Sequence, residues 1–239
     1  MKVSSWVITD KGLRRESNQD SYLINEDLNI FIVADGMGGH SGGEVASRLA
    51  VLGVQDTFIK ETTLKDPREK LMKAYIEASH RIFDMAQNEK PELMGMGTTM
   101  VMAYIQENKI YIANIGDSRC YLFKKPHLWQ LTEDHSLINE QIRAGMLNDE
   151  QIKNFVGKNV ITRSVGYERE VFPDVIEREL VVGEKYLLCS DGLSGLVEDE
   201  DIEKILNKKD SAQATRLCVE QALANGGDDN VTVLVLEIG

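Results

Sequence analysis

Hydrophobic residues follow two different spacings along this chain of 239 residues. Compact runs rich in β-branched side chains, such as 28–34 and 231–238, are typical of buried strands. At 44–60 and 67–87, apolar residues recur every three or four positions, which predicts helices. The first has an acidic residue in its opening turn, and the second has Pro67 near its start.

The middle of the chain changes to strand-like runs at 98–105, 109–115 and 119–123, separated by short polar turns. Connections this short favour antiparallel hairpins, because a parallel return needs a crossover of about a dozen residues or more. A strand at 185–190 and helices at 199–206 and 211–224 precede the last strand. We expect a single domain over residues 1–239, an α+β fold in which helices flank a β-sandwich.

The segment 136–164 has a weaker pattern. Two short amphipathic pieces, 137–144 and 149–155, are interrupted by Gly145 and Gly157. Long excursions from a compact fold often serve as lids or substrate-binding elements. We therefore expect a flap subdomain here.

Composition narrows the function classes. The 27 basic and 39 acidic residues leave a net charge of −12, so no basic footprint for nucleic acid is present. No apolar run approaches the ~18 residues of a membrane span, and the first residues lack the apolar core of a signal peptide. Cysteines at three scattered positions argue against a disulfide framework. We expect a cytoplasmic monomer with reduced, buried thiols, and no membrane partner.

Five aspartates have a similar sequence context, because most of them are next to a glycine and adjoin an apolar run. They are Asp20, Asp35, Asp117, Asp191 and Asp229. A single Asp-Gly pair is common turn chemistry, so each alone is at least as well explained by a turn or a helix cap. Together they indicate carboxylates at the ends of strands. Carboxylates without clustered cysteine or histidine suit Mg²⁺ or Mn²⁺, so the sequence predicts a multi-metal hydrolytic site.

A series of motifs, in order along the chain, carries a family resemblance. They are Arg15-Glu16-Ser17-Asn18-Gln19-Asp20, Val33-Ala34-Asp35-Gly36-Met37-Gly38-Gly39-His40, Gly95-Met96-Gly97-Thr98-Thr99, Asn114-Ile115-Gly116-Asp117-Ser118-Arg119, Ser190-Asp191-Gly192-Leu193 and Gly227-Asp228-Asp229-Asn230-Val231-Thr232. The chain resembles metal-dependent Ser/Thr protein phosphatases of the PP2C (PPM) family in their compact bacterial form. The resemblance implies a four-layer α/β/β/α sandwich of two antiparallel sheets flanked by helices.

The resemblance also implies a centre of two Mn²⁺ or Mg²⁺ ions, with a weaker third site. Asp35 matches the aspartate that bridges both ions. Asp35 and Asp191 are both expected to be catalytic residues. Gly36 matches a carbonyl ligand of one ion, which Asp191 and Asp229 complete. Asp20 matches the ligand position of the second ion, and Asp117 with Asp191 matches the third site. In the implied reaction, a water or hydroxide bridging the two ions attacks the phosphate.

Two further residues have candidate roles. Arg15 is expected to bind phosphate oxygens, a task that suits a planar guanidinium better than an ammonium. Its position five residues before Asp20 distinguishes it from Arg14. His40 is either the general acid for the departing alkoxide or a surface or capping residue of its Gly-rich loop, and both interpretations stay open. His135 is interpreted as a structural loop residue.

The leading functional hypothesis is a phosphatase that removes phosphate from serine and threonine in proteins and opposes Ser/Thr kinases. Its expected partners are phosphorylated proteins, a Ser/Thr kinase among them. A non-catalytic regulator would have lost ligand residues, and none of the matched residues is lost here. A hydrolase of small phosphate esters or phosphodiesters is excluded less firmly. The methionines at 94, 96, 100 and 102 are expected in the core.

Overall fold

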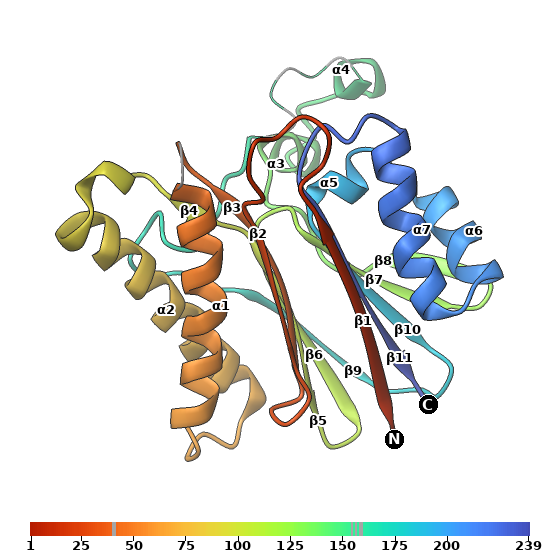
Figure 1. The fold of residues 1–239 in the computed structure, drawn as a ribbon, viewed down its shortest axis with the longest axis horizontal. Helices are drawn as coiled ribbons and strands as arrows, with labels where there is room; N and C mark the ends of the chain where they lie inside the picture. The colour runs from red at the N-terminus through yellow and green to blue at the C-terminus, as the bar shows by residue number, and fades with distance from the viewer. Residues whose placement is uncertain (40–41, 154, 156, 158–159) are drawn as a thin grey trace.

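Two antiparallel sheets stack face to face, and helices cover both outer faces (Figure 1). The computed structural model describes residues 1–239 except 40–41, 154, 156 and 158–159. One sheet has the strand order β1-β11-β10-β7-β8, and the other has the order β2-β3-β5-β6-β9, with β4 paired to β3. Helices α1 and α2 lie against the second sheet, and α6 and α7 against the first. The predicted four-layer sandwich is confirmed.

The strands are β1 (Val3–Asp10), β2 (Asp20–Asn25), β3 (Ile30–Met37), β4 (Gly97–Thr98), β5 (Met100–Gln106), β6 (Lys109–Ile115), β7 (Arg119–Lys124), β8 (His127–Gln130), β9 (Asp174–Glu179), β10 (Lys185–Cys189) and β11 (Val231–Ile238). The helices are α1 (Gly42–Lys60), α2 (Pro67–Asp84), α3 (Leu137–Arg143), α4 (Asp149–Lys153), α5 (Asp191–Ser194), α6 (Asp199–Lys208) and α7 (Ser211–Ala224), with a π-helical turn η1 (Met85–Glu89) and a 3₁₀ turn η2 (Pro91–Leu93).

The core forms three apolar layers because successive side chains of a strand point to opposite faces. In β3, Phe31 and Val33 face the other sheet, whereas Ile30 and Ile32 pack under α1 and α2. A strand that is buried on both faces needs apolar residues at every position, which explains the unbroken run at 28–34. A third layer joins β7, β10 and β11 to α6 and α7.

Some elements differ from the sequence-based expectations. The second helix ends at Asp84 and continues as the π-helical turn, and the run 98–105 is divided at Thr99 into β4 and β5. Strands β8 and β9 were not expected, because they are short and largely polar. The core assignment of Met94 is wrong. It follows the 3₁₀ turn and is 64% exposed, whereas Met96, Met100 and Met102 are buried.

The strand register gathers the motif segments at one end of the sandwich. The last residue of β1, Asp10, pairs with Val231, the first residue of β11. The last residue of β10, Cys189, pairs with Arg119, the first residue of β7. Segments that are more than 200 residues apart in sequence, such as 10–20 and 229–232, therefore share one edge.

Tyr75 ties α2 to the second sheet and gives a test of this packing. Its buried hydroxyl lies 3.0 Å from the Met100 carbonyl and 2.8 Å from the Ala113 carbonyl, and it donates to this pair. We expect Tyr75→Phe to lower the free energy of unfolding by about 1–2 kcal/mol, because a buried hydrogen bond is lost. Urea denaturation measures the change. Tyr22→Phe, at a side chain that is 43% exposed, is the control, and equal effects in both variants would contradict the assignment.

Candidate metal centre

Asp20 and Asp35 stand opposite each other on the paired strands β2 and β3. Directly opposite residues of an antiparallel pair project from the same face of the sheet. Asp20 is the first residue of β2, and Asp35 follows the buried stretch of β3. The sheet itself therefore places these two carboxylates side by side.

Asp20 also connects the two sheets. Its Oδ2 accepts hydrogen bonds from Ser190 Oγ at 2.8 Å and from Thr232 Oγ1 at 2.6 Å. The Thr232 N–H donates to Ser190 Oγ at 2.9 Å, which closes the group. The other carboxylate oxygen, Oδ1, is buried with no partner among the described residues. One oxygen of Asp20 thus anchors the side chain, and the other is left for a ligand.

The backbone at Asp35 is held by the Gly97-Thr98-Thr99 segment. The Asp35 N–H donates to Thr99 Oγ1 at 3.0 Å, and its carbonyl accepts from Thr99 N–H and Thr98 Oγ1, both at 2.8 Å. At Gly36, a Cβ would lie 2.0 Å from the Gly43 carbonyl oxygen, so only glycine fits there. Asp35 and the adjoining Gly36 are therefore set in a rigid frame.

Asp191 opens the short helix α5, immediately after Ser190. The following Gly192 packs against β11, where a Cβ would lie 2.0 Å from the Asn230 carbonyl oxygen. Asp191 Oδ1 is buried and, among the described residues, has no hydrogen-bond partner. Asp229 lies beside the same loop, with Oδ2 accepting from Arg15 Nη2 at 2.5 Å. Asp191 and Asp229 thus approach each other from adjacent elements. Together with Asp20 and Asp35 they form the carboxylate cleft.

The electrostatics show that these carboxylates share one site. Burial raises the pKa of Asp20 to about 7, with further contributions from the charges of Asp191 and Asp229. Burial also raises the pKa of Asp35 well above its ordinary value, and the charges of Asp20 and Asp191 add to the effect. The pKa of Asp191 is raised by burial and then by Asp229. A cation in the cleft would relieve each of these penalties.

The donor set fits divalent cations of the Mg²⁺ and Mn²⁺ type. It consists of carboxylate oxygens and the Gly36 carbonyl, and two of the carboxylate oxygens are buried with no hydrogen-bond partner in the described part of the chain. Within the described part of the chain, no three His, Cys, Asp or Glu side chains already stand at the spacing of a finished ion site.

Asp117 lies on a cavity of about 400 Å³ that Asp191 also lines. Burial raises the pKa of Asp117 to about 7, followed by the charges of Asp191 and Asp134. The same cavity is lined by Ile138 and Ile142 of the α3 region. The structure therefore brings Asp117 and Asp191 together, beside the predicted flap.

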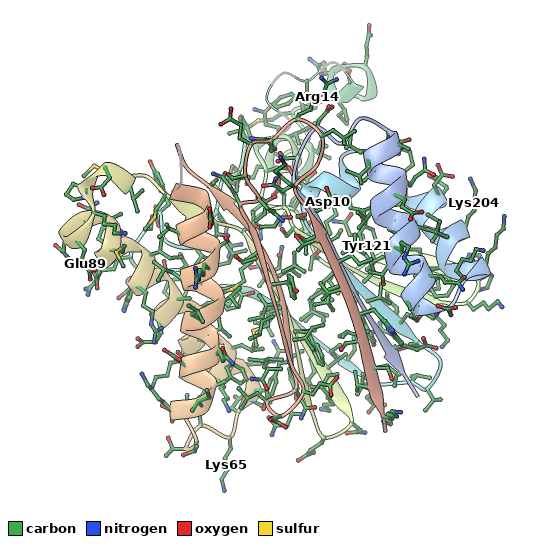
Figure 2. The ribbon with its side chains drawn as sticks, viewed as in Figure 1. Asp10, Arg14, Lys65, Glu89, Tyr121 and Lys204 are labelled. Carbon is green, nitrogen blue, oxygen red and sulfur yellow. The ribbon has the colours of Figure 1, made fainter. Side chains whose placement is uncertain are left out.

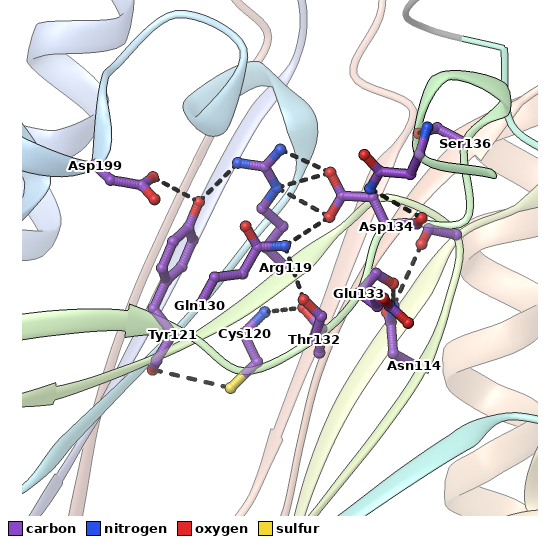
Figure 3. Close-up of polar contacts among 12 residues, drawn as sticks. Asn114, Arg119, Cys120, Tyr121, Gln130, Thr132, Glu133, Asp134, Ser136 and Asp199 are labelled. Atoms are coloured by element: carbon purple, nitrogen blue, oxygen red, sulfur yellow. Dashed lines mark hydrogen bonds and ion pairs between the residues drawn. The ribbon is translucent and has the colours of Figure 1, made fainter. Parts of the chain in front are cut away.

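A polar network borders this cavity (Figure 3). The Arg119 guanidinium donates from Nε and Nη2 to the Asp134 carboxylate, at 3.0 Å and 2.6 Å. Its Nη1 donates to the Tyr121 hydroxyl at 2.9 Å, which in turn donates to Asp199 Oδ1 at 2.9 Å. The network joins β7 to the start of α6 and was not anticipated, because its members are distant in sequence.

Arg15 lies on the loop between β1 and β2, beside Asp229. Asn230 holds this loop, since its Nδ2 donates to the carbonyls of Lys11 and Ser17 at 2.8 Å and 2.9 Å. Arg14 instead approaches Asp228, at 3.7 Å, and points outward at the end of the sandwich (Figure 2). Arg15, and not Arg14, therefore contacts a carboxylate that is expected to bind an ion, while its role toward phosphate stays a prediction.

Comparison with known proteins gives a match to the family model for protein phosphatase 2C over residues 9–231. The chain belongs to the protein phosphatase 2C family. The serine/threonine phosphatase stp of Listeria monocytogenes is 39% identical over 236 residues, which cover 96% of this chain and 93% of that protein.

Two solved structures of phosphatases are similar over nearly their whole length. The Mycobacterium tuberculosis serine/threonine phosphatase PstP/Ppp has a TM-score of 0.91 and 35% identity, covering 99% of this chain and 98% of that one. The catalytic domain of serine threonine protein phosphatase PstP in complex with 2 manganese ions has a TM-score of 0.88 and 34% identity, covering 99% of each chain.

The predicted family, fold class and enzyme class are thereby confirmed, and so is the dependence on Mn²⁺ or Mg²⁺ that is general in the family. Like its relatives, this phosphatase acts on phosphorylated proteins. Of the helices that the structure describes, none is both long and apolar enough to cross a membrane.

His40 lies outside the described residues, so its role stays a prediction. Sequence reasoning missed Ser190 and Thr232 as the anchors of Asp20, although both stand inside the quoted motifs. It also missed the part that Thr98 and Thr99 play in fixing the backbone of Asp35. Of these residues only Ser190 adjoins a motif aspartate in the sequence, and the bonded partners Asp35–Thr99 and Asp20–Ser190 lie 64 and 170 positions apart.

The raised carboxylate pKa values predict how stability depends on pH after chelation. Burial raises the pKa of Asp20 and Asp117 to about 7 from 3.8 in the folded protein. Between these values the folded protein binds protons that the unfolded chain has released. Stability is therefore greatest below the unfolded pKa and is lost as pH rises through about 7. We expect each group to contribute a slope of at most about 1.4 kcal/mol per pH unit.

Urea denaturation in EDTA, between about pH 5 and pH 8, measures this loss. Saturating Mn²⁺ should reverse it, because ions bind the deprotonated carboxylates and not the unfolded chain. Asp228→Asn, at a neighbouring exposed carboxylate, serves as the control and should leave the slope unchanged. A free energy of unfolding that rises with pH in EDTA would contradict the assignment.

Proposed function

We propose that this phosphatase hydrolyses phosphoserine and phosphothreonine in proteins at the carboxylate cleft described above. The ion-binding residues in this proposal are Asp20, Asp35, Gly36, Asp117, Asp191 and Asp229. The observation that carries the proposal is the convergence of buried carboxylates with unpartnered oxygens at one end of the sandwich. Arg15 stands beside them.

Each residue has a distinct task. In the bound state, two Mn²⁺ or Mg²⁺ ions supply charge for the phosphoryl group and acidify a water molecule that serves as the nucleophile. The Asp35 carboxylate feels the charges of Asp20, Asp191 and Asp229, which suits a ligand shared by two ions. The Gly36 carbonyl, Asp191 and Asp229 would hold one ion, and Asp20 would hold the other. Ser190 and Thr232 donate hydrogen bonds to Oδ2 of Asp20, so its Oδ1 would be available to bind the ion.

Arg15 and His40 act on the substrate in this proposal. The Arg15 guanidinium is half-exposed and has further N–H donors besides the one on Asp229, so it can bind phosphate oxygens in a bidentate fashion. His40 supplies a proton to the leaving serine or threonine oxygen. Asp117 and Asp191 form the weaker third site on the cavity they share.

The retained residues favour this function over the alternatives. A non-catalytic regulator would not need a cleft of carboxylates held at such an electrostatic cost. Hydrolysis of small phosphate esters or phosphodiesters would use the same ions. The family assignment and the named relatives favour protein substrates. We further propose that a Ser/Thr kinase is among the substrates, since the reaction reverses kinase action.

The cellular setting is part of the proposal. We place the enzyme in the cytoplasm as a monomer that binds neither nucleic acid nor membrane. The three buried cysteines are free thiols, in keeping with a reducing compartment. The net charge of −12 opposes binding to a nucleic-acid backbone.

The central test is hydrolysis of a phosphothreonine peptide with Mn²⁺. We expect Asp191→Ala to lower kcat by at least about 1,000-fold, because removal of a charge-stabilising ligand costs several kcal/mol in the transition state. Steady-state kinetics measures the change. Asp228→Ala is the matched control, since Asp228 is an exposed carboxylate beside the site and pairs only with Arg14 among the described residues. Inactivity of the wild-type enzyme with both Mn²⁺ and Mg²⁺ would refute the proposal.

We also propose that 1–239 is one domain and that 136–164 is its flap. The two ends of the segment meet, because Ser136 and Ile161 form an isolated β-bridge and the Leu137 N–H donates to the Val160 carbonyl at 2.8 Å. Helix α3 begins at the same point, capped by the Ser136 hydroxyl. A segment closed on itself in this way can vary without disturbing the sandwich.

Exchanging 136–164 for the corresponding segment of the Listeria monocytogenes relative tests the flap. We expect the ratio of kcat/KM between two phosphopeptides to change several-fold, while hydrolysis of p-nitrophenyl phosphate stays within about two-fold. Exchange of the 61–66 loop, between α1 and α2, is the control. Equal loss of peptide and small-ester hydrolysis would show that the segment serves the chemistry itself.

A further inference from the structure

His135 holds Gly116 by two hydrogen bonds, one in each direction. The backbone N–H of His135 donates to the Gly116 carbonyl at 3.0 Å, and the backbone N–H of Gly116 donates to the ring atom Nδ1 of His135 at 3.0 Å. The histidine side chain is only 7% exposed. Because Gly116 directly precedes Asp117, these two hydrogen bonds fix the turn that carries the Asp117 side chain.

The turn cannot easily adjust by itself. Gly116 has a φ of +103°, which favours glycine, and a Cβ there would lie 2.6 Å from the Cβ and Cγ2 atoms of Thr99. Thr99 is in turn the residue that holds the Asp35 backbone. The Gly116 turn therefore fits between the frame of Asp35 on one side and His135 on the other.

The hydrogen bonds define the protonation of the imidazole. A backbone N–H can only donate, so Nδ1 of His135 is the acceptor and the neutral ring carries its proton on Nε2. Nε2 lies 3.0 Å from Asp174 Oδ2, to which it donates. Arg163 Nη1 donates to Asp174 Oδ1 at 3.0 Å. It also lies 2.8 Å from Nε2, but with the proton on Nε2 both nitrogens are donors, so this contact is not a hydrogen bond. Burial lowers the pKa of His135, which keeps the ring neutral.

His135 also contacts the returning end of the flap segment. Its carbonyl accepts from the Thr162 N–H at 2.9 Å, and Arg163 follows directly in sequence. Arg163 Nη2 donates to the Phe172 carbonyl. The same histidine thus joins the Asp117 turn to 162–163, where the flap segment returns to the sandwich.

We propose that His135 is a positioning residue for Asp117, holding that carboxylate on the cavity it shares with Asp191. The inference rests on the proposed assignment of Asp117 to the weaker ion site. A histidine that fixes the backbone of a ligand acts as groups behind metal ligands do, whose loss typically weakens binding by about 10- to 100-fold. Asn114 Nδ2 supports the same turn through the Gly116 carbonyl at 3.3 Å, but only His135 holds the Gly116 N–H among the described residues.

Calorimetric titration of the full chain with Mn²⁺ alone tests the inference. We expect His135→Ala to weaken the weakest class of Mn²⁺ sites by about 10-fold or more, and to leave the tighter class within about two-fold. His135→Asn should restore most of the affinity, because its amide oxygen can accept from Gly116 where Nδ1 does. His135→Gln places its amide near Nε2 and should not. His127→Ala, at a histidine whose side chain is 64% exposed on β8, is the matched control.

Asp117→Asn separates failure of the inference from failure of the assignment beneath it. If this variant leaves the weak class intact, the assignment of Asp117 fails and the inference fails with it. If Asp117→Asn removes the weak class but His135→Ala retains it, only the inference is overturned. Equal weakening of both classes would make His135 a general structural residue and would also overturn it. If His135→Ala does not fold, the contrast between the Asn and Gln variants decides, and equal affinities would refute the proposal.

Discussion

Mutual repulsion among Asp20, Asp35, Asp191 and Asp229 is the constraint on which the architecture of this phosphatase depends. Burial and neighbouring negative charge both raise the pKa of the first three carboxyl groups. Holding these charged carboxylates close together costs electrostatic free energy, and bound protons or cations reduce this cost. The free ionised carboxylates therefore cost the fold stability, and the same arrangement suits a divalent ion. Family membership identifies that ion as Mn²⁺ or Mg²⁺.

The surrounding structure holds these carboxylates through their backbones and through single oxygens. Asp35 is fixed by Thr98 and Thr99, and Asp20 uses one oxygen for Ser190 and Thr232 while its other oxygen has no partner among the described residues. Because the anchors come from both sheets, the sandwich can separate only if these bonds break. The three apolar layers supply the stability that offsets the cost of the cleft.

The side of the site that carries Asp117 adjoins the segment 136–164. The cavity shared by Asp117 and Asp191 is lined by residues of the α3 region, and His135 links the Asp117 turn to the end of the flap segment. The segment proposed as the flap is thus linked by hydrogen bonds to the turn that carries Asp117.

The sequence by itself determined the family, the alternating elements and the five aspartates. A strand that is buried on both faces must be apolar at every position, and the Asp-Gly motifs directly follow such strands. Both features can be recognised in a short stretch of sequence. Other features depended on contacts with residues far away in the sequence. They are strands β8 and β9, the exposure of Met94 and the division of the strand at Thr99. Only the tertiary structure decided that Ser190 and Thr232 anchor Asp20, and that His135 holds Gly116. Those bonds join residues 19 to 212 positions apart, and a hydrogen-bond partner at such a distance leaves no periodic trace in the sequence.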